Sequence, residues 1–245
     1  MHEDTIGDTQ HKTLWTGRVS RDILEPMFER IIDKYFSFEN YYRIAGKPVF
    51  SIFDYSNLVT GLGGAEATAD AFAWMRRRCE TSNLPGLDIQ AIARFQSGVE
   101  AGAKLDAGTE TATAKALGFD SATSYQYCLD SGSTGDYVHW ADKAISTWPR
   151  CEGIFTTYYP HVSIGWDNTH RNPSAGEDHV VLNATPEAFE ACLFKAKAWL
   201  DTRPKQTPLI TINSWNEWTE GSYLLPDMRW GYRYLQAVCK VLGKE

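Results

Sequence analysis

The chain has 245 residues, 43% of them apolar, and a formal net charge of −7. That length and apolar share suffice for one globular domain, and the length is usual for one α/β barrel. The acidic balance and the lack of a basic stripe argue against nucleic acid and anionic membrane surfaces as partners. No apolar run approaches the ~20 residues of a membrane span, and residues 1–8 lack a signal-peptide core. We therefore expect a cytoplasmic protein from the sequence as given, although a start further upstream would change this.

Strand and helix signals alternate along the chain. The strand signals, short β-branched or aromatic runs, lie at 48–54, 87–95, 121–125, 153–158 and 209–213. The helical patterns lie at 23–35, 65–81, 110–117, 136–146, 186–202 and 232–242. This alternation predicts parallel βα units of the (β/α)8 TIM-barrel type.

The number of predicted strands is too small for a closed barrel, which needs eight. We predict a single domain over 1–245 with about five βα units, in which residues 1–46 form a helical lead-in and the amino-terminal units are missing. An incomplete barrel leaves open parallel edges, which favour self-association or pairing with a missing amino-terminal half.

Five cysteines lack any C-x-x-C spacing, and their odd number cannot pair fully within one chain. They are Cys79, Cys128, Cys151, Cys192 and Cys239. We expect most of them to be buried thiols.

Residues 208–226 carry the clearest chemical signal, because an apolar strand runs directly into Glu217 and Glu220. Acidic residues at the carboxyl end of a parallel strand are typically catalytic. Two carboxylates three residues apart repel each other, which raises the proton affinity of one and favours an acid and base pair. The alternative is a solvated helical face. The neighbouring aromatic rings of Trp215, Trp218 and Tyr223 favour a sugar site instead.

A second stretch, 165–171, follows the predicted strand at 153–158 and should lie on the same face as the glutamates. Trp166 is suited to stack on a sugar ring, and Asp167 and Arg171 to bind its hydroxyls or to position Glu220. The alternative is a structural turn with an internal pair between Asp167 and Arg171. Of Tyr158 and Tyr159, at most one should reach the pocket, because alternate strand residues face opposite ways.

Cofactor motifs are weak in this sequence. The glycines at 61–64 precede Glu66, where a dinucleotide fingerprint needs glycine or alanine. His161, Asp167 and His170 match no standard metal-ligand spacing. We therefore expect no cofactor and no metal.

Three ordered stretches resemble the glycoside hydrolase family 99-like (GH99-like) proteins, which include the WbsX-type proteins of polysaccharide gene clusters and, more distantly, the endo-α-mannosidases. They are YRIAGKPVF at 42–50, YPHVSIGWDNTHR at 159–171, and WNEWTEGSYLLPD at 215–227 followed by WGYRYL at 230–235. The resemblance spans about 35–240. It implies the carboxyl-terminal part of a barrel, with the strand after Gly46 similar to roughly the fourth.

The resemblance also implies retaining cleavage of a polysaccharide or oligosaccharide. Glu217 would take the proton from the sugar's own 2-hydroxyl, and Glu220 would act as general acid and then base. The residues alone suggest the commoner scheme with a carboxylate nucleophile, and they name the same pair. The expected substrate contacts are Trp215, Asn216, Trp218, Tyr223, Tyr159, Trp166, Asp167 and Arg171.

Two alternatives to a hydrolase stay open. One is a polysaccharide-biosynthesis glycosyltransferase, the label that WbsX-type proteins often carry. A transferase that uses a nucleotide sugar would be expected to show a diphosphate or metal motif. The other is a non-catalytic glycan-binding module, which the missing barrel units favour.

Overall fold

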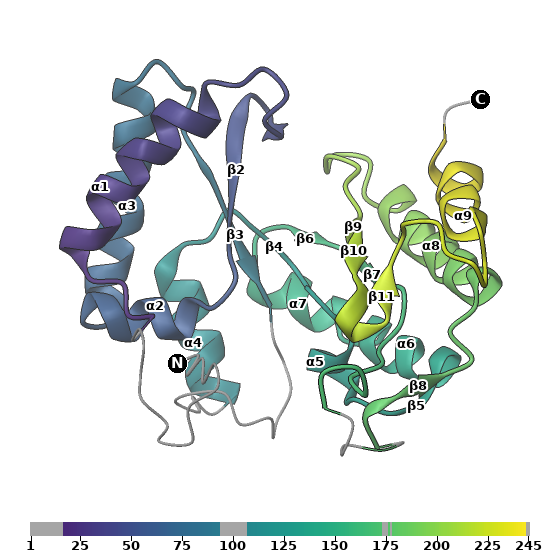
Figure 1. Cartoon of the computed structure of the whole chain (residues 1–245). Helices are drawn as coiled ribbons and strands as arrows, with labels where there is room; N and C mark the ends of the chain where they lie inside the picture. Colours follow the sequence, from purple (N-terminus) through teal and green to yellow (C-terminus); the bar gives the residue numbers. More distant parts are fainter. Residues whose placement is uncertain (1–16, 94–106, 173–175, 177, 244–245) are drawn as a thin grey trace. The chain divides into compact units, whose positions relative to one another are not determined.

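The computed structural model describes residues 17–93, 107–172, 176 and 178–243 (Figure 1). The chain divides into two compact units. Unit 1 comprises Met1–Ile92 and Ser97–Asp120, and unit 2 comprises Ala93–Gln96 and Ser121–Glu245. Strands and helices alternate in both units, as the sequence predicts, and the fold is α/β.

In the described part of unit 1, a helix packs against a small sheet. Its elements are α1 (Arg21–Ile31), a π-helical turn (Ile32–Phe36), β1 (Arg43–Ile44), β2 (Lys47–Ile52), α2 (Tyr55–Leu62), α3 (Ala65–Thr81), β3 (Asp88–Ile92) and α4 (Ala107–Leu117). Strand β1 pairs with β2 in an antiparallel hairpin, and β2 pairs with β3 in parallel. The short strand β1 lies within the 1–46 stretch that the sequence assigned only to helix.

Helices α1 and α3 run side by side in unit 1, as Figure 1 shows. Arg21 donates to Asp70 at 2.9 Å, and Arg78 donates to both carboxylate oxygens of Glu29 at 2.5 and 2.8 Å. Every residue of β3 is buried, which is typical of a parallel strand covered on both faces. Gly63 and Gly64, at φ +95° and +127°, separate α2 from α3 in a conformation that other residues rarely adopt.

Unit 2 contains several parallel strand pairs and the carboxyl-terminal helices. Its elements are β4 (Ser121–Thr123), α5 (Cys128–Ser131), β5 (Gly135–Asp136), α6 (Tyr137–Ile145), α7 (Trp148–Ile154), β6 (Tyr158–Tyr159), β7 (His161–Ser163), β8 (Val181–Leu182), α8 (Pro186–Asp201), β9 (Thr211–Asn213), β10 (Asn216–Glu217), a 3₁₀ turn (Trp218–Glu220), β11 (Ser222–Tyr223) and α9 (Arg233–Leu242). The parallel pairs are β4 with β6, β7 with β9, and β5 with β8. Strands β10 and β11 form an antiparallel hairpin.

Helices α8 and α9 lie together in unit 2, where the rings of Phe189 and Tyr234 meet edge to face at 5.5 Å. Thr185 caps α8 by accepting from the amide of Ala188 at 3.3 Å, and Pro186 occupies the first helical position. These local signals explain why the predicted helix at 186–202 is confirmed within one residue.

The predicted strand at 153–158 is wrong over most of its length. The chain forms α7 through Ile154, and the strand pairing begins only at Tyr158. Pro149, near the start of α7, favours helix initiation there, and the apolar residues that suggested a strand instead end the helix. Pro160 separates β6 from β7 along the chain, and as a proline it has no amide hydrogen to donate to a neighbouring strand.

Strand β7 was not expected from the sequence, and it is the strand that leads into 165–171. The count of five βα units is therefore not confirmed. Parallel strands that alternate with helices are consistent with an incomplete barrel. The lead-in at residues 1–16 and the predicted strand end at 94–95 lie outside the described residues.

The predicted cysteine environment is confirmed. Cys79, Cys128, Cys151 and Cys192 are buried thiols, and Cys239 is exposed. Burial raises the pKa of Cys79 and of Cys151 to about 12, which keeps these thiols protonated and unreactive. Among the helices that the structure describes, none is both long enough and apolar enough for a bilayer span.

Candidate active site on the Asn216–Tyr223 hairpin

Both predicted catalytic glutamates lie on the hairpin that follows β9. In this hairpin Asn216 faces Tyr223 and Glu217 faces Ser222. The 3₁₀ turn at Trp218–Glu220 connects the two strands, so that Glu217 stands just before the turn and Glu220 at its end. The alternative, a solvated helical face that carries both acids, is therefore not formed.

Gly221 closes the turn with φ +60°. A Cβ atom at this position would lie 2.9 Å from the Cβ of Asp167, closer than side chains pack. The amide of Asp167 donates to the carbonyl of Glu220 at 2.8 Å. The segment that follows β7 therefore lies directly against the hairpin, and a glycine at 221 permits this approach.

Arg171 joins the two carboxylates. Its Nη1 donates to Glu220 Oε1 at 2.7 Å, and its Nη2 donates to Glu217 Oε1 at 3.1 Å. The Thr219 hydroxyl donates to the same Glu217 oxygen at 2.6 Å and accepts from Arg171 Nε at 3.2 Å. One guanidinium thus orients two acids that the sequence placed in one site.

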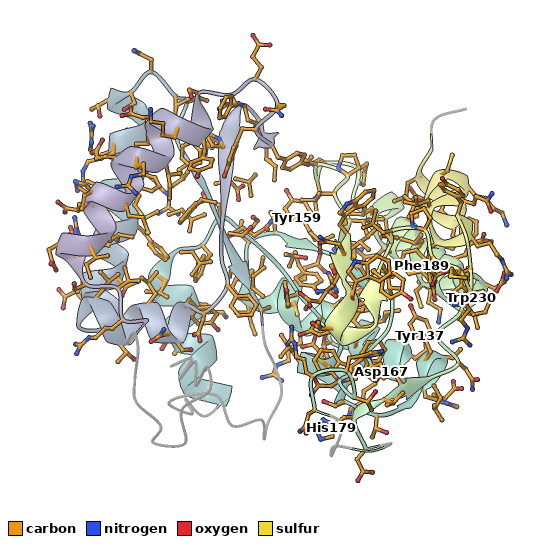
Figure 2. All side chains as sticks on the ribbon, in the orientation of Figure 1. Tyr137, Tyr159, Asp167, His179, Phe189 and Trp230 are labelled. Atoms are coloured by element: carbon orange, nitrogen blue, oxygen red, sulfur yellow. The ribbon has the colours of Figure 1, made fainter. Side chains whose placement is uncertain are left out.

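The alternative pair within 165–171 does not form, because Asp167 is engaged locally. Its Oδ1 accepts from the amide of Thr169 at 3.0 Å and from the Thr169 hydroxyl at 2.5 Å. Asp167 thereby shapes the turn that carries Arg171 toward the glutamates (Asp167 is labelled in Figure 2).

The two carboxylates differ in environment. The Glu220 side chain is 12% exposed and that of Glu217 is 34% exposed. Burial raises the pKa of Glu220, the cation of Arg171 opposes this, and the charge of Glu217 adds to it. From the sequence we expected mutual repulsion to raise the proton affinity of one glutamate. In the structure, desolvation is the larger cause of the raised pKa of Glu220. Glu220 is the acid better suited to hold a proton.

Tyr125, just beyond β4, is a neighbour of the pair that the sequence did not single out. Burial raises its pKa, and the charges of Glu220 and Glu217 raise it further. Its phenol therefore lies within electrostatic reach of both acids. The signal available in the sequence was its place at the carboxyl end of a predicted parallel strand, where barrel enzymes place functional residues.

The aromatic residues of the hairpin form an exposed surface. The rings of Trp218 and Tyr223 lie 3.9 Å apart between centroids with an interplanar angle of 32°. Trp215 and Asn216 are also exposed, and the Tyr223 hydroxyl donates to Asp227 Oδ2 at 2.9 Å. Flat exposed rings beside carboxylates have the character of a carbohydrate-binding surface.

Of the other expected substrate contacts, Tyr159 is covered and Trp166 is half-buried. Tyr159 is 2% exposed (labelled in Figure 2), and its neighbour Tyr158 is fully buried. Neither ring presents a surface to a ligand, because both belong to the core around β6. Trp166 is half-buried, and its indole nitrogen is buried without a hydrogen-bond partner among the described residues.

His161, considered for a metal, is enclosed in the core instead. Its ring nitrogens lie 2.9 Å from Thr211 Oγ1 and 3.0 Å from Ser163 Oγ. Burial lowers the pKa of His161 to about 3, so the ring is neutral at ordinary pH. This histidine acts as a hydrogen-bonding group of the strand interior.

The chain resembles known proteins in sequence. The family model described as glycosyltransferase WbsX matches residues 6–238. Two proteins called uncharacterized protein WxcX, from two strains of Xanthomonas campestris pv. campestris, are each 32% identical to this chain over 120 residues. That match covers 49% of this chain and 17% of each relative, so the chain matches only a small part of their length.

Solved structures share the fold at low sequence identity. A glycoside hydrolase-like protein has a TM-score of 0.66 at 17% identity, over 91% of this chain and 62% of its own. A GH99 endo-α-mannosidase from Bacteroides thetaiotaomicron has a TM-score of 0.59 at 17% identity, over 94% of this chain and 65% of its own. This chain therefore spans less than two thirds of either structure.

Proposed function

This chain belongs to the WbsX glycosyltransferase family, and we propose that its hairpin site cleaves a glycosidic bond with retention of configuration. The observation that carries this proposal is the shared contact of Arg171 with Glu217 and Glu220, two acids that differ in burial. Burial raises the pKa of Glu220 and so favours its protonated form beside a more exposed carboxylate, which is the arrangement of an acid and base pair.

In the first step Glu217 removes the proton from the sugar's 2-hydroxyl. The freed oxygen attacks C1 of the same sugar, and the bond from C1 to the leaving oxygen breaks. Glu220 donates its proton to that leaving oxygen, so the products are a 1,2-anhydro sugar and an alcohol. The hydrogen bonds of Arg171 and Thr219 to Glu217 hold this base in a defined orientation.

In the second step Glu220, now a carboxylate, removes a proton from water. The water oxygen attacks C1, the bond from C1 to O2 breaks, and the protonated Glu217 returns its proton to O2. Both acids regain their first protonation state, and two inversions at C1 give net retention. The scheme places the more buried acid at the leaving group, where a raised pKa is useful.

The exposed rings of Trp215 and Trp218 support the proposal that the substrate is a polysaccharide or oligosaccharide. Apolar C–H faces of sugars stack on flat indoles, and hydroxyls bind adjacent polar groups such as Asn216. The endo-α-mannosidase of similar fold makes α-mannosidic linkages the first ones to assay.

The family description favours one alternative, a glycosyl transfer. The first step is unchanged in that case, and a sugar hydroxyl replaces water as the acceptor in the second. The nature of the acceptor then separates the two activities, because the same two glutamates act in both.

The test is to incubate the chain with α-linked manno-oligosaccharides and other bacterial polysaccharide fragments in ¹⁸O-labelled water. Turnover with the label at C1 of a product of retained configuration supports the hydrolase, and longer unlabelled products support the transferase. Glu217→Gln and Glu220→Gln should each abolish turnover, while Glu152→Gln, an acid paired with Arg203, should not. Glycan binding that persists in all variants, with no product from the unmodified chain, would indicate a binding module and overturn the proposal.

A further inference from the structure

We infer that Gln126 is a positioning residue whose buried amide ties the segment carrying Arg171 to the hairpin carrying Glu217 and Glu220, and this role rests on the function proposed above. Gln126 lies just after β4 and is 1% exposed. It contacts no substrate surface, so its effect on chemistry would pass through the residues that it holds.

The Gln126 side chain lies where three segments meet. Its Nε2 donates to Asn213 Oδ1 at 2.9 Å and to the carbonyl of Gly165 at 3.3 Å, and it lies 3.4 Å from Ser222 Oγ. Its Oε1 accepts from the amide of Tyr127 at 2.9 Å. Because the Tyr127 amide is a donor only, it sets the amide orientation and directs the two N–H groups toward the three acceptors.

Each acceptor leads to the site within a few residues. Asn213 ends β9 and, with Ser222, forms the base of the hairpin, where Ser222 Oγ donates to the Asn213 carbonyl at 2.9 Å. Gly165 begins the segment that reaches Glu220 through the amide of Asp167. A Cβ atom on Gly165 would lie 3.3 Å from the Gly221 carbonyl oxygen, so the two segments are already at close approach there.

Removal of this amide leaves buried acceptors without donors. Asn213 Oδ1 and the Gly165 carbonyl would then need water or a shift of the backbone, since an unsatisfied buried acceptor is costly. Either change separates 165–171 from the hairpin. The groups that face Glu220 are Arg171 and Glu217, with Tyr125 close by, and their spacing depends on this contact.

The test compares Gln126→Met with Gln206→Met. Methionine keeps the volume of glutamine and removes its hydrogen bonds. Gln206 is a matched control in unit 2, because its Nε2 donates to a backbone carbonyl, that of Tyr158, at 2.8 Å. Two readouts do not need activity: amide hydrogen exchange at Asp167, and the titration of Glu220 by ¹³C NMR of carboxyl-labelled glutamate, assigned with Glu220→Gln.

We expect Gln126→Met to speed exchange of the Asp167 amide by at least about tenfold, because the segment opens locally. It should also move the titration of Glu220, because the burial that raises this pKa and the Arg171 cation that lowers it both depend on how closely 165–171 lies against the hairpin. Gln206→Met should leave the exchange of the Asp167 amide and the titration of Glu220 unchanged, even if it lowers the melting temperature as much as Gln126→Met does. If Gln126→Met lowers the melting temperature but leaves either readout unchanged, the inference is overturned.

If Gln126→Met does not fold, Ser222→Ala tests the inference instead. It removes the hydroxyl that accepts from Gln126 and donates to the Asn213 carbonyl. Faster exchange at Asp167 supports the inference, and unchanged exchange overturns it. In a chain that turns over glycans, Gln126→Met should lower kcat by roughly ten- to a hundredfold with KM little changed. If the unmodified chain shows no turnover, the proposed function fails, while the exchange and titration results still settle what Gln126 holds.

Discussion

Arg171 donates to Glu220 at 2.7 Å across 49 positions of sequence, although Asp167 stands only four residues before it. The long-range partner prevails because Asp167 already accepts two hydrogen bonds from Thr169 and has one face covered by the hairpin. The consequence is a cation held between two acids, which lowers the electrostatic cost of keeping both in one site.

Loss of the Arg171 cation should raise the pKa of Glu220 further. Arg171 lowers that pKa against the effect of burial, so Arg171→Met leaves burial and the charge of Glu217 unopposed. The ¹³C titration of the Glu220 carboxyl should shift to higher pH. Arg203→Met, which removes a cation paired with Glu152, is the control and should not move it. A Glu220 titration that stays in place would contradict the contact described here.

Loss of the Glu217 charge should lower the pKa of Glu220, whereas loss of the Arg171 cation should raise it. Glu217 raises the pKa of Glu220, and Glu217→Gln removes that repulsion while keeping the side-chain shape. The general acid would then lose its proton at lower pH. The ¹³C titration profile of the Glu220 carboxyl in Glu217→Gln should therefore move to lower pH. A profile that moves to higher pH would contradict this prediction.

Gly221→Ala should destabilise the chain and disturb the site together. The residue needs φ +60°, and its added Cβ would lie 2.9 Å from Asp167 Cβ. Gly231→Ala is a matched control, since φ is +53° and nothing lies within 4 Å of its Cβ. We expect both to cost about 1 kcal/mol for the backbone, and Gly221→Ala to cost roughly 1–3 kcal/mol more for the clash. Urea unfolding measures the difference, and equal losses would show that the close approach to Asp167 is unimportant.

His161 should make unfolding depend on pH. Burial lowers its pKa to about 3 from an ordinary value of 6.5, so the folded state disfavours the protonated ring. The stability that it contributes is full above the unfolded pKa of 6.5 and is lost as pH falls from there toward the folded pKa. Between about pH 7.5 and about pH 5 this loss should be about 2 kcal/mol.

His161→Gln should reduce that dependence, and His139→Gln should not, because the His139 side chain is 90% exposed. The free energy of unfolding of each variant, measured in urea at both pH values, gives the comparison. A pH dependence equal in His161→Gln and the unmodified chain would contradict the buried neutral histidine.

Trp218→Ala should weaken glycan binding by about tenfold, since an exposed indole that stacks on sugar contributes on the order of 1 kcal/mol or more. Trp218 is 44% exposed and lies against Tyr223, so its removal leaves the fold intact. Isothermal titration with the oligosaccharides used for turnover measures the change. Tyr35→Ala, a similarly exposed ring in unit 1, is the control, and equal losses would place the glycan elsewhere.

Local sequence patterns predicted several parts of this chain well. The helix at 65–81 has the predicted bounds, the helix at 186–202 ends one residue earlier than predicted, and the helix at 136–146 is one residue shorter at each end. Caps and apolar periodicity act over a few residues, so a sequence can be examined for them directly. The strand at 153–158 failed because an apolar run is compatible with both a helix and a strand, and only its packing decides.

The sequence by itself determined the chemistry available to the site: two acids three residues apart, with aromatic neighbours, at the carboxyl end of a strand. Only the tertiary structure decided which of the two acids is the more buried and which cation lies between them. Burial raises the pKa of Glu220, and Arg171 bonds to the distant Glu217 and Glu220 in preference to its neighbour Asp167. Residue spacing governs contacts within a turn or a helix face. Desolvation and long-range hydrogen bonds, such as those of Gln126, depend on segments far apart in the chain that meet only when it folds.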